Sequence, residues 1–447
     1  MTPPARIQAG IELIEATRAA PEAPADRVAN AFFRARRFIG SGDRRAIADR
    51  HWSILRGEAK LAWRLERVGA PVTPRLLMLA QLLAEGLGAD AAAGLFSGAL
   101  HGPAPLAERE RRALVALAAL PPGDEALPEA VRYGVPPWLL PHLAARFGPS
   151  LPAEMAALDR PAPTDLRANL LKITREEARA ALAAEGIYAA PTPFSPWGLR
   201  VAGRRPVTGT AAFREGRVEI QDEGSQLIAL LVDARPGMRV VDFCAGAAGK
   251  TLALAAAMGN RGRLVAADVS AARLDAAVKR LRRGGVANAE RRLLAPGDKW
   301  AKRAAGSFDR VLVDAPCTGT GTWRRNPDAR TRLRPEDLAE LTVKQEAILD
   351  LASRLVKPGG LLVYATCSVL SEENERQVER FSARNPDFAI VPLAKAWRAV
   401  CAASPPPCAG PFLSLTPARH GTDGFFAAVL RRSGSDQTPG EQRERAA

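Results

Sequence analysis

Two cysteines stand directly after short apolar runs in the C-terminal half of the chain. Cys317 follows the run 310–314, and Cys367 follows the run 361–365. Runs of this length, rich in Val and Leu, are typical of buried parallel strands, so each cysteine is predicted just past the carboxyl end of a strand. Ligands of open α/β sheets bind at that edge. Two thiols at these positions therefore indicate covalent chemistry.

A buried cysteine can instead serve as a small hydrophobic side chain. The neighbours of the two thiols argue against that alternative, because Asp314 precedes Cys317, and Thr366 and Ser368 flank Cys367. Polar groups of this kind favour a reactive site over a packed core.

A loop of small residues is predicted between the strand 238–243 and an apolar helix that begins at Leu252. Such a loop lets the backbone approach a ligand closely and directs a helix N-terminus at it. The next strand, 263–267, ends at Asp268, and a carboxylate about 20 residues after the loop can bind ribose hydroxyls. We therefore expect an adenosine-type cofactor. Its expected contacts are Cys244, Ala245, Gly246, Ala247, Ala248, Gly249, Lys250 and Asp268.

Three features favour S-adenosyl-L-methionine (SAM) over NAD as that cofactor. The loop lacks the GxGxxG spacing of a dinucleotide site, there is no second glycine cluster for a phosphate, and hydride transfer needs no cysteine nucleophile. The sequence Gly249-Lys250-Thr251 is not part of a P-loop, because the upstream glycine of that motif is absent.

The composition favours a cytoplasmic protein with a polyanionic partner. The 447 residues carry a net charge of +15, which favours nucleic acid as the partner. Solubility alone, or the Arg-rich and Ala-rich composition of proteins from a GC-rich genome, would also account for this charge. Five cysteines without paired spacing argue against a disulfide scaffold, and the lack of a CxxC motif or a His cluster predicts no metal site. No signal or transmembrane pattern is present, so we expect no membrane partner. We also expect a monomer.

Residues 1–145 are predicted to be helical. Ile7, Ile11 and Ile14 show the spacing of one helix face. The arginine-rich stretch 32–56 suits either a surface that meets a phosphate backbone or a solvated helix face.

The remainder of the chain is expected to form two further domains and a tail. Residues 146–215 predict a small α+β module, with a strand near 166–172 and a helix opened by a capping box at Thr174. Residues 216–432 alternate strand, loop and helix, which predicts a doubly wound parallel sheet. The tail 433–447 is polar and charged, and is expected to be disordered.

Several motifs together resemble the Sun-domain (NOL/NOP/Sun) family of RNA cytosine-C5 methyltransferases. They are QDEGS at 221–225, DFCAGAAGKT at 242–251, DAPCTGTGT at 314–322, RRNPD at 324–328, ATCS at 365–368, EENE at 372–375 and DGFF at 423–426. The resemblance implies a Rossmann-like SAM methyltransferase domain preceded by an RRM-like module. More weakly, residues 1–145 resemble the all-α, NusB-like RNA-binding domain of the RsmB-type bacterial members.

The resemblance also implies a role for each catalytic residue. Cys367 would be the nucleophile that adds to carbon 6 of cytosine, and Cys317 would assist release of the methylated base. Asp314 would hold the cytosine edge and border the cofactor. Lys250 would contact the base, and a cation there would also help to form a thiolate. DNA cytosine methyltransferases use the Pro-Cys element instead, and position alone does not rank the two thiols.

The cofactor contacts follow from the same resemblance, with one departure in the loop. Asp268 would bind the ribose and Asp298 the adenine, whereas Cys244 is expected to pack rather than react. Ala247 and Ala248 stand where the family usually has proline and glycine. A positive φ at Ala248 would destabilise the loop by roughly 1 kcal/mol, so we expect weaker or slightly shifted SAM binding with activity kept.

The implied substrate is a base that leaves its stack, which is easier in single-stranded or looped RNA. Small-subunit ribosomal RNA is the leading expectation. A tRNA is the alternative substrate, and a non-catalytic RNA-binding assembly factor is the alternative class, supported only by the two alanines of the loop. Basic side chains that could follow the phosphates are Arg324, Arg325, Arg330, Arg332 and Arg334, while Arg280, Arg282 and Arg283 also suit a solvated helix face.

Overall fold

The computed structural model describes residues 1–447 except 122, 124–126, 204, 296 and 435–447. The tail predicted at 433–447 therefore lies almost wholly outside the described residues. The chain packs as two compact units. One comprises Met1–Asp159 and Trp323–Pro335, and the other comprises Arg160–Thr322 and Glu336–Ala447.

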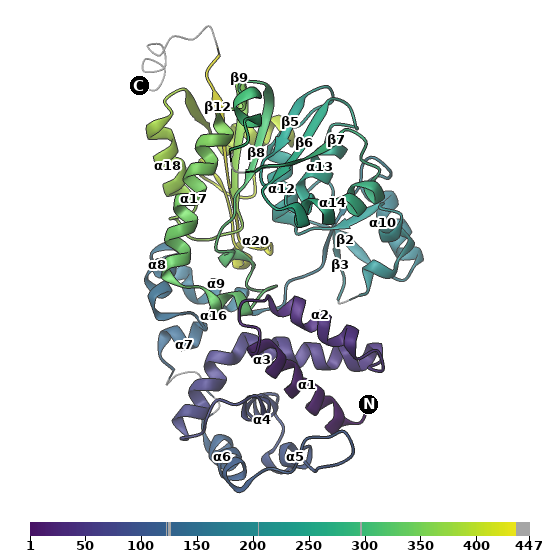
Figure 1. Ribbon diagram of the computed structural model, residues 1–447, viewed down its shortest axis with the longest axis vertical. Coiled ribbons are helices and arrows are strands. Elements are labelled where there is room, and N and C mark those ends of the chain that lie inside the picture. The colour runs from purple at the N-terminus through teal and green to yellow at the C-terminus, as the bar shows by residue number, and fades with distance from the viewer. Residues whose placement is uncertain (122, 124–126, 204, 296, 435–447) are drawn as a thin grey trace. The chain divides into compact units, whose positions relative to one another are not determined.

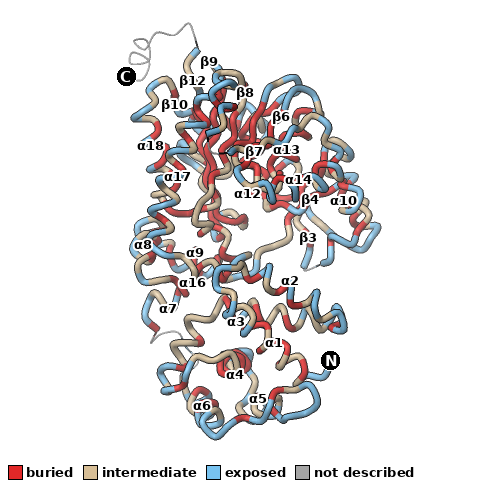
Figure 2. Tube along the Cα trace, in the orientation of Figure 1, coloured by how far each residue is buried: buried red, intermediate tan, exposed pale blue. Residues whose placement is uncertain are grey.

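The first unit is helical, as the sequence predicts for its N-terminal part (Figure 1). Ile7, Ile11 and Ile14 are buried in its core, and α4 is buried along almost its whole length (Figure 2). Thr73 starts α4 by accepting a hydrogen bond from the backbone N–H of Leu76 at 3.2 Å. The helices are α1 (Pro3–Arg18), α2 (Ala25–Ala35), α3 (Ser41–Arg67), α4 (Pro74–Ala84), α5 (Ala89–Gly94), α6 (Glu108–Ala119), α7 (Glu129–Tyr133), α8 (Leu140–Phe147) and α9 (Leu151–Asp159).

The segment Trp323–Pro335 belongs to this helical unit, although the sequence places it within the domain 216–432. It contains the short helix α16 (Asp328–Arg332). Its buried polar groups find their partners there: the Asp328 carboxylate accepts the N–H of Ala25 at 3.1 Å, and Arg330 pairs with Asp159 at 2.6 Å. The domain boundary predicted at 145 also falls inside α8.

A small four-stranded antiparallel sheet, in the order β2-β3-β1-β4, opens the second unit. The predicted capping box starts α10, because the Glu177 N–H donates to Thr174 Oγ1 and the Thr174 N–H donates to Glu177 Oε2. The strand expected at 166–172 ends earlier, since Asn169 turns the chain and donates to the carbonyl of Gly216. The elements are β1 (Asp165–Ala168), α10 (Arg175–Ala184), β2 (Ala189–Pro191), β3 (Gly198–Val201), α11 (Ala211–Arg214) and β4 (Val218–Ile220).

The main sheet has eight strands, seven of them in the order β10-β12-β9-β8-β5-β6-β7, with β11 paired to β12. The five strands from β9 to β7 are parallel, as the sequence predicts. They are β5 (Arg239–Asp242), β6 (Arg263–Asp268), β7 (Ala289–Leu293), β8 (Phe308–Asp314) and β9 (Val356–Thr366). Strand order reverses between β5 and β8, so the carboxyl ends of these two strands form the switch point where ligands of such sheets bind.

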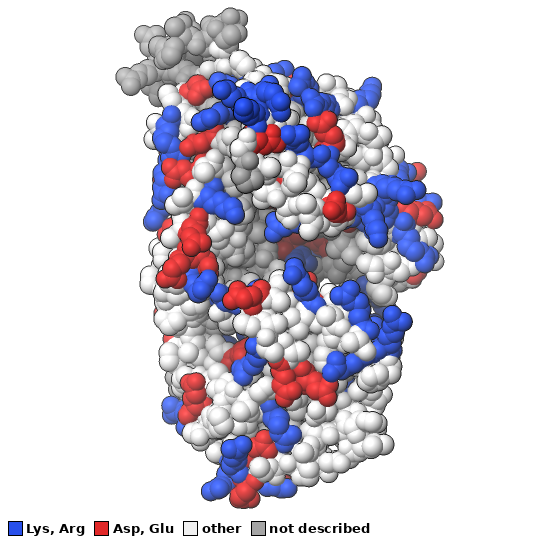
Figure 3. All heavy atoms as spheres, in the orientation of Figure 1, with Lys and Arg blue, Asp and Glu red and all other residues white. Residues whose placement is uncertain are grey.

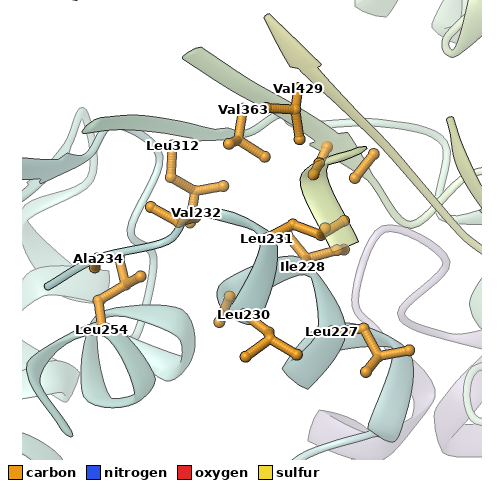
Figure 4. Packing of buried hydrophobic residues seen from close by; sticks show 14 of the residues in the cluster. Leu227, Ile228, Leu230, Leu231, Val232, Ala234, Leu254, Leu312, Val363 and Val429 are labelled. Carbon is orange, nitrogen blue, oxygen red and sulfur yellow. The ribbon is translucent and has the colours of Figure 1, made fainter. Parts of the chain in front are cut away.

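Helices cover both faces of this sheet, in agreement with the doubly wound fold expected. Residues of α12 pack against Leu312, Val363 and Val429 of the sheet (Figure 4). The other face buries Phe381 of α18 and Leu349 of α17. The helices are α12 (Glu223–Leu231), α13 (Gly249–Ala257), α14 (Ala271–Gly284), α15 (Trp300–Arg303), α17 (Pro335–Ser353), α18 (Glu375–Arg384), α19 (Leu393–Val400) and α20 (Pro417–His420).

One edge of the sheet is antiparallel, a feature that the prediction of a doubly wound parallel sheet did not include. The strands β10 (Phe388–Val391), β11 (Leu413–Leu415) and β12 (Phe425–Arg432) are antiparallel to their neighbours. Strand β12 begins at the carboxyl edge of the parallel strands, since Phe426 lies opposite Thr366 at the end of β9. Just before β12, the Gly424 N–H donates to the carbonyl of Gly321 at 2.8 Å. A Cβ at Gly321 would lie 2.1 Å from the carbonyl oxygen of Gly424, so this approach requires glycine.

The part of the chain that the structure describes contains neither a membrane-spanning helix nor a metal-binding cluster. Within it, no helix combines the length and hydropathy needed to cross a bilayer. Nor does any group of three or more His, Cys, Asp or Glu residues there offer a metal site.

Candidate active site

The two cysteines singled out from the sequence meet at the switch-point edge. Strands β8 and β9 are adjacent and parallel, with Asp314 opposite Ala365, so the loops that follow them emerge side by side. The Sγ atoms of Cys317 and Cys367 lie 3.4 Å apart. Both thiols are free and only partly buried. The predicted neighbourhood of the two thiols is therefore present in the structure.

The environment of Cys317 favours its protonated form. The hydrogen bond with Cys367, together with burial, raises the pKa of the Cys317 thiol well above its ordinary value. Cys317 therefore keeps its proton at neutral pH while the pair is unperturbed. An arrangement in which one thiol holds a proton beside the other suits two different chemical tasks.

Lys250 supplies a positive charge beside this pair. Its Nζ lies 2.7 Å from Oδ2 of Asp314, and its side chain is only 8% exposed. Burial acts to lower the pKa of Lys250, but the charges of Asp314, Asp242 and Cys367 outweigh it and raise the pKa. Lys250 is therefore a cation at neutral pH, and a cation near a thiol stabilises its thiolate.

The cofactor loop passes into α13 through a residue in the left-handed conformation. Ala248 has φ 63° and ψ 30°, the left-handed region, directly before α13. The condition considered from the sequence, a positive φ at this alanine, is therefore met. Arg280 of α14 holds the preceding residue, because its Nη1 donates to the carbonyl of Ala247 at 2.8 Å while its Nη2 binds Glu219.

Two carboxylates border the same loop. Asp268, at the end of β6, accepts hydrogen bonds from the N–H groups of Gly246 and Ser270, each at 2.8 Å. Asp242, at the end of β5, accepts a hydrogen bond from Thr251 Oγ1 at 2.7 Å, and burial raises its pKa to about 7.

These residues fit the cofactor predicted from the sequence. The second carboxylate oxygen of Asp242 is buried without a hydrogen-bond partner among the described groups, so a polar acceptor is left over beneath the loop. Gly246 has φ +53°, and no atom lies within 4 Å of the position a Cβ would take, which leaves room above the loop. Small residues, a helix N-terminus and carboxylates at two strand ends are the groups that hold a nucleoside.

Asp298 makes its hydrogen bonds within its own loop, and the adenine contact predicted for it stays a prediction. Its Oδ2 accepts a hydrogen bond from Arg292 at 2.6 Å, and its Oδ1 accepts one from the N–H of Trp300 at 2.8 Å. Both oxygens thus stabilise their own loop and the start of α15. Cys244 packs against the core on one face of the sheet, and burial raises the pKa of its thiol, in keeping with the packing role expected.

Of the arginines predicted to follow the phosphates after the Pro-Cys loop, Arg324 and Arg330 are buried, whereas Arg334 is exposed. The Arg330 side chain is 3% exposed and is bound by Asp159 and the carbonyl of Tyr133, so the phosphate role predicted for it is wrong. Arg324 is likewise buried, and Arg332 pairs with Asp328 at 2.9 Å.

Glu373 and Asn374 are functional-site residues to which the sequence reasoning gave no role. Glu373 accepts hydrogen bonds from the segment containing Cys317, and Asn374 bonds the segment containing Cys367. The only signal in the sequence was the EENE block, whose meaning depends on partners far away along the chain.

Comparison with known proteins identifies the family of this chain. A family model described as 16S rRNA methyltransferase RsmB/F matches residues 229–431, and a ferredoxin-like domain of RsmF/B-like methyltransferases matches residues 135–208. The probable ribosomal RNA small subunit methyltransferase B of Synechocystis sp. is 34% identical over 307 residues, which cover 68% of each chain. Ribosomal RNA small subunit methyltransferase B of Pasteurella multocida is also 34% identical, over 66% of this chain and 65% of its own. The alignments thus span about two thirds of these relatives.

Solved structures share the architecture. The crystal structure of PH0851 matches with a TM-score of 0.77 and 26% identity, over 97% of this chain and 99% of that one. A methyltransferase homologue from Pyrococcus horikoshii matches with a TM-score of 0.57 and 28% identity, over 68% of this chain and 97% of its own. The predictions of a Rossmann-like methyltransferase fold, of a small α+β module and of SAM as cofactor are confirmed, and the family model describes the module as ferredoxin-like. The chain belongs to the RsmB/F family of SAM-dependent methyltransferases.

Proposed function

We propose that this protein methylates carbon 5 of a cytosine in small-subunit ribosomal RNA. The observation that carries the proposal is the pair of thiols 3.4 Å apart at the switch point, beside the Lys250–Asp314 ion pair. The names of the relatives, ribosomal RNA small subunit methyltransferase B, support the choice of RNA.

The pair accounts for a reaction that carbon 5 does not undergo readily by itself. The Cys367 thiolate adds to carbon 6, and the displaced electron pair makes carbon 5 nucleophilic. SAM, held by the loop 244–250 and Asp268, supplies the electrophilic methyl group and leaves as S-adenosyl-L-homocysteine. The proton on carbon 5 then passes to a base, the Cys367–carbon bond breaks, and the ring double bond is restored.

The charged residues suit these two stages. Lys250 stabilises the thiolate. We assign Asp314 to the cytosine edge, where its carboxylate accepts the exocyclic amine and, once the ring nitrogen is protonated, that nitrogen as well, which favours the polarised ring. We assign Cys317 to the second stage, as the base that takes the proton from carbon 5. Once Cys367 is bonded to carbon 6, the hydrogen bond that contributes most to the raised pKa of Cys317 is lost, so its own proton passes to solvent and the thiolate accepts the carbon 5 proton. A decayed, non-catalytic factor is disfavoured because Ala248 still adopts the left-handed conformation of the loop.

The test compares RNA from a deletion strain with RNA from its parent. We expect bisulfite sequencing to show loss of methylation at a cytosine of small-subunit rRNA, and its return when the purified protein and SAM are added. Loss confined to tRNA would support the alternative substrate. If no cytosine changes in either RNA, the protein does not act on carbon 5.

We further propose that residues 1–145 form an RNA-binding domain and that the enzyme is a cytoplasmic monomer with no metal. The five free cysteines suit a reducing compartment. Figure 3 shows Lys and Arg side chains over the visible face of both units, with Asp and Glu between them. Within the stretch 32–56, Arg36 forms an ion pair with Glu12, and Arg50 forms one with Glu85. These two arginines are thus engaged within the helical unit, and the other arginines of the stretch remain candidates for phosphate contacts.

A truncation tests this part of the proposal. Removal of residues 1–145 is expected to weaken RNA binding or site choice while SAM binding persists. RNA affinity should also fall steeply with salt. Unchanged affinity and site choice after truncation would assign the helical segment another purpose, and light scattering of the full chain checks the monomer.

A further inference from the structure

Glu373 is a buried carboxylate that binds the segment containing Cys317 through several hydrogen bonds and also contacts Ser368, next to Cys367. It is 0% exposed. Its Oε1 accepts hydrogen bonds from the Thr318 N–H at 2.8 Å and from Gln345 Nε2 at 2.9 Å, and its Oε2 accepts the Thr318 hydroxyl. Gln345 also donates to the carbonyl of Pro316 at 2.9 Å. The residues on both sides of Cys317 are therefore held by Glu373 and its partner.

Asn374 does the same for the segment that contains Cys367. Its Nδ2 donates to the carbonyl of Ser368 at 2.9 Å, and its Oδ1 accepts the hydroxyl of Thr366. Asn374 is also 0% exposed. The residues on both sides of Cys367 are thus tied to a single amide side chain.

The two anchors are fixed relative to each other by covalent geometry. Glu373 and Asn374 are consecutive, so their Cα atoms are about 3.8 Å apart. The hydroxyl of Tyr364 donates to the Glu373 carbonyl at 2.6 Å, which ties this turn to strand β9. The two cysteine segments also contact each other directly, because Ser368 Oγ lies 3.0 Å from Thr320 Oγ1 and the Gly321 N–H donates to the Cys367 carbonyl at 3.0 Å. The peptide unit that joins Glu373 and Asn374 adds a covalently fixed spacing to these contacts.

We infer that Glu373 is the positioning residue for Cys317 and Asn374 is the positioning residue for Cys367. The inference rests on the proposed function, in which the two thiols act at different stages. Misplacing a catalytic group by about 1 Å can reduce rates by about 10²-fold. Loss of Glu373 should therefore impair the second stage, and loss of Asn374 should impair the first.

The chemistry of the contacts separates positioning from proton transfer at Glu373. Burial raises the pKa of Glu373, but the contacts need only an acceptor at Oε1 and a hydrogen-bonding group at Oε2. A glutamine supplies both, because its amide can donate to the Thr318 hydroxyl. Glu373→Gln should thus keep Cys317 in place, whereas Glu373→Ala should not.

The experiment follows the protein–RNA adduct of the full-length protein on denaturing gels, with in vitro transcribed small-subunit rRNA and SAM. Cys317→Ala serves as the reference for a trapped adduct. We expect Glu373→Ala to accumulate the adduct and to turn over about 10²-fold more slowly than the unaltered protein. Glu373→Gln should stay within about threefold of it, and Asn374→Ala should lose turnover without accumulating adduct. Arg376→Ala, an exposed neighbour on α18, is the matched control and should be unchanged.

Three results would overturn the inference: a Glu373→Ala protein that turns over normally, a Glu373→Gln protein as impaired as Glu373→Ala, or adduct accumulation in Asn374→Ala. SAM titration of each variant checks folding. If Glu373→Ala does not bind SAM, the double variant Thr318→Ala/Gln345→Ala removes the side-chain donors to Glu373 from the other side and must itself accumulate adduct. If even Cys317→Ala traps no adduct while the unaltered protein methylates RNA, the assigned roles of the thiols fail, which is a different outcome.

Discussion

Arg280 donates a hydrogen bond to the carbonyl of Ala247 at 2.8 Å and so braces the cofactor loop from outside. Its second amino group bonds Glu219 at 3.1 Å, which fixes the direction of the guanidinium. The loop carries alanine where relatives of the Sun-domain type usually have proline and glycine. A side chain on α14 therefore supplies part of the order that a proline would impose on the backbone.

Replacing Arg280 by methionine should weaken SAM binding without removing the fold. The loop carbonyl would lose a charge-assisted hydrogen bond, worth about 1.5 kcal/mol, which corresponds to roughly tenfold in Kd. Calorimetric titration measures the change. Arg282→Met, an exposed position on the same helix, is the control and should bind SAM normally. Equal affinities in the two variants would show that the brace has no effect on the cofactor.

Ala248→Gly should leave stability nearly unchanged. The left-handed conformation destabilises an alanine by roughly 1 kcal/mol, and glycine relieves this. The methyl group, however, is 0% exposed and packs with Leu252 and Ala277, and its removal costs about 0.8 kcal/mol. The two effects nearly cancel, so a shift in Tm of a few degrees at most is expected, with SAM binding equal or tighter. A marked loss of SAM affinity would mean that the alanine is required.

The placement of the thiols and the loop could be predicted because it follows from strand ends. Apolar runs identify β8 and β9, and the switch-point rule then brings their following loops together. The place of Ala248 in the loop raised the question of a positive φ, because glycine usually stands there, but the φ value itself came only from the structure. Neither the placement of the thiols nor that of the loop needed knowledge of which side chains touch.

What could not be predicted depends on contacts between distant residues. The hydrogen bonds of Glu373 to Thr318 span 55 positions, and no local pattern reveals them. The sequence suggested that Arg330 is a surface cation. In the structure its side chain is buried and is bound by Asp159, which lies 171 positions away. The antiparallel β12 was missed because periodicity gives a strand but not its direction.

The stability of the protein should carry a pH dependence that originates at Asp242. Burial raises its folded-state pKa from 3.8 to about 7. Between these values the unfolded carboxyl is ionised while the folded one stays protonated, so stability falls as pH rises and the penalty is complete above about pH 7. Each pH unit in that window contributes roughly 1.4 kcal/mol.

Asp242→Asn should remove this contribution while its oxygen still accepts the Thr251 hydroxyl. Relative to the unaltered protein, the variant should gain roughly 2 kcal/mol between pH 5 and pH 7, measured by urea unfolding without cofactor. Taking the difference between the two proteins at each pH cancels the other titrating groups. A difference that stays constant with pH would place the pKa of Asp242 outside this window.

The order of the two thiols can be read from which variant traps RNA. Cys367→Ala lacks the attacking group, so it should neither methylate RNA nor form a covalent complex. Cys317→Ala should still attack carbon 6 but fail to complete release, so an adduct that survives denaturing electrophoresis should accumulate. A mutant blocked after attack traps the intermediate, whereas one blocked before attack cannot. The reverse pattern, with an adduct only in Cys367→Ala, would make Cys317 the nucleophile, as in the DNA enzymes.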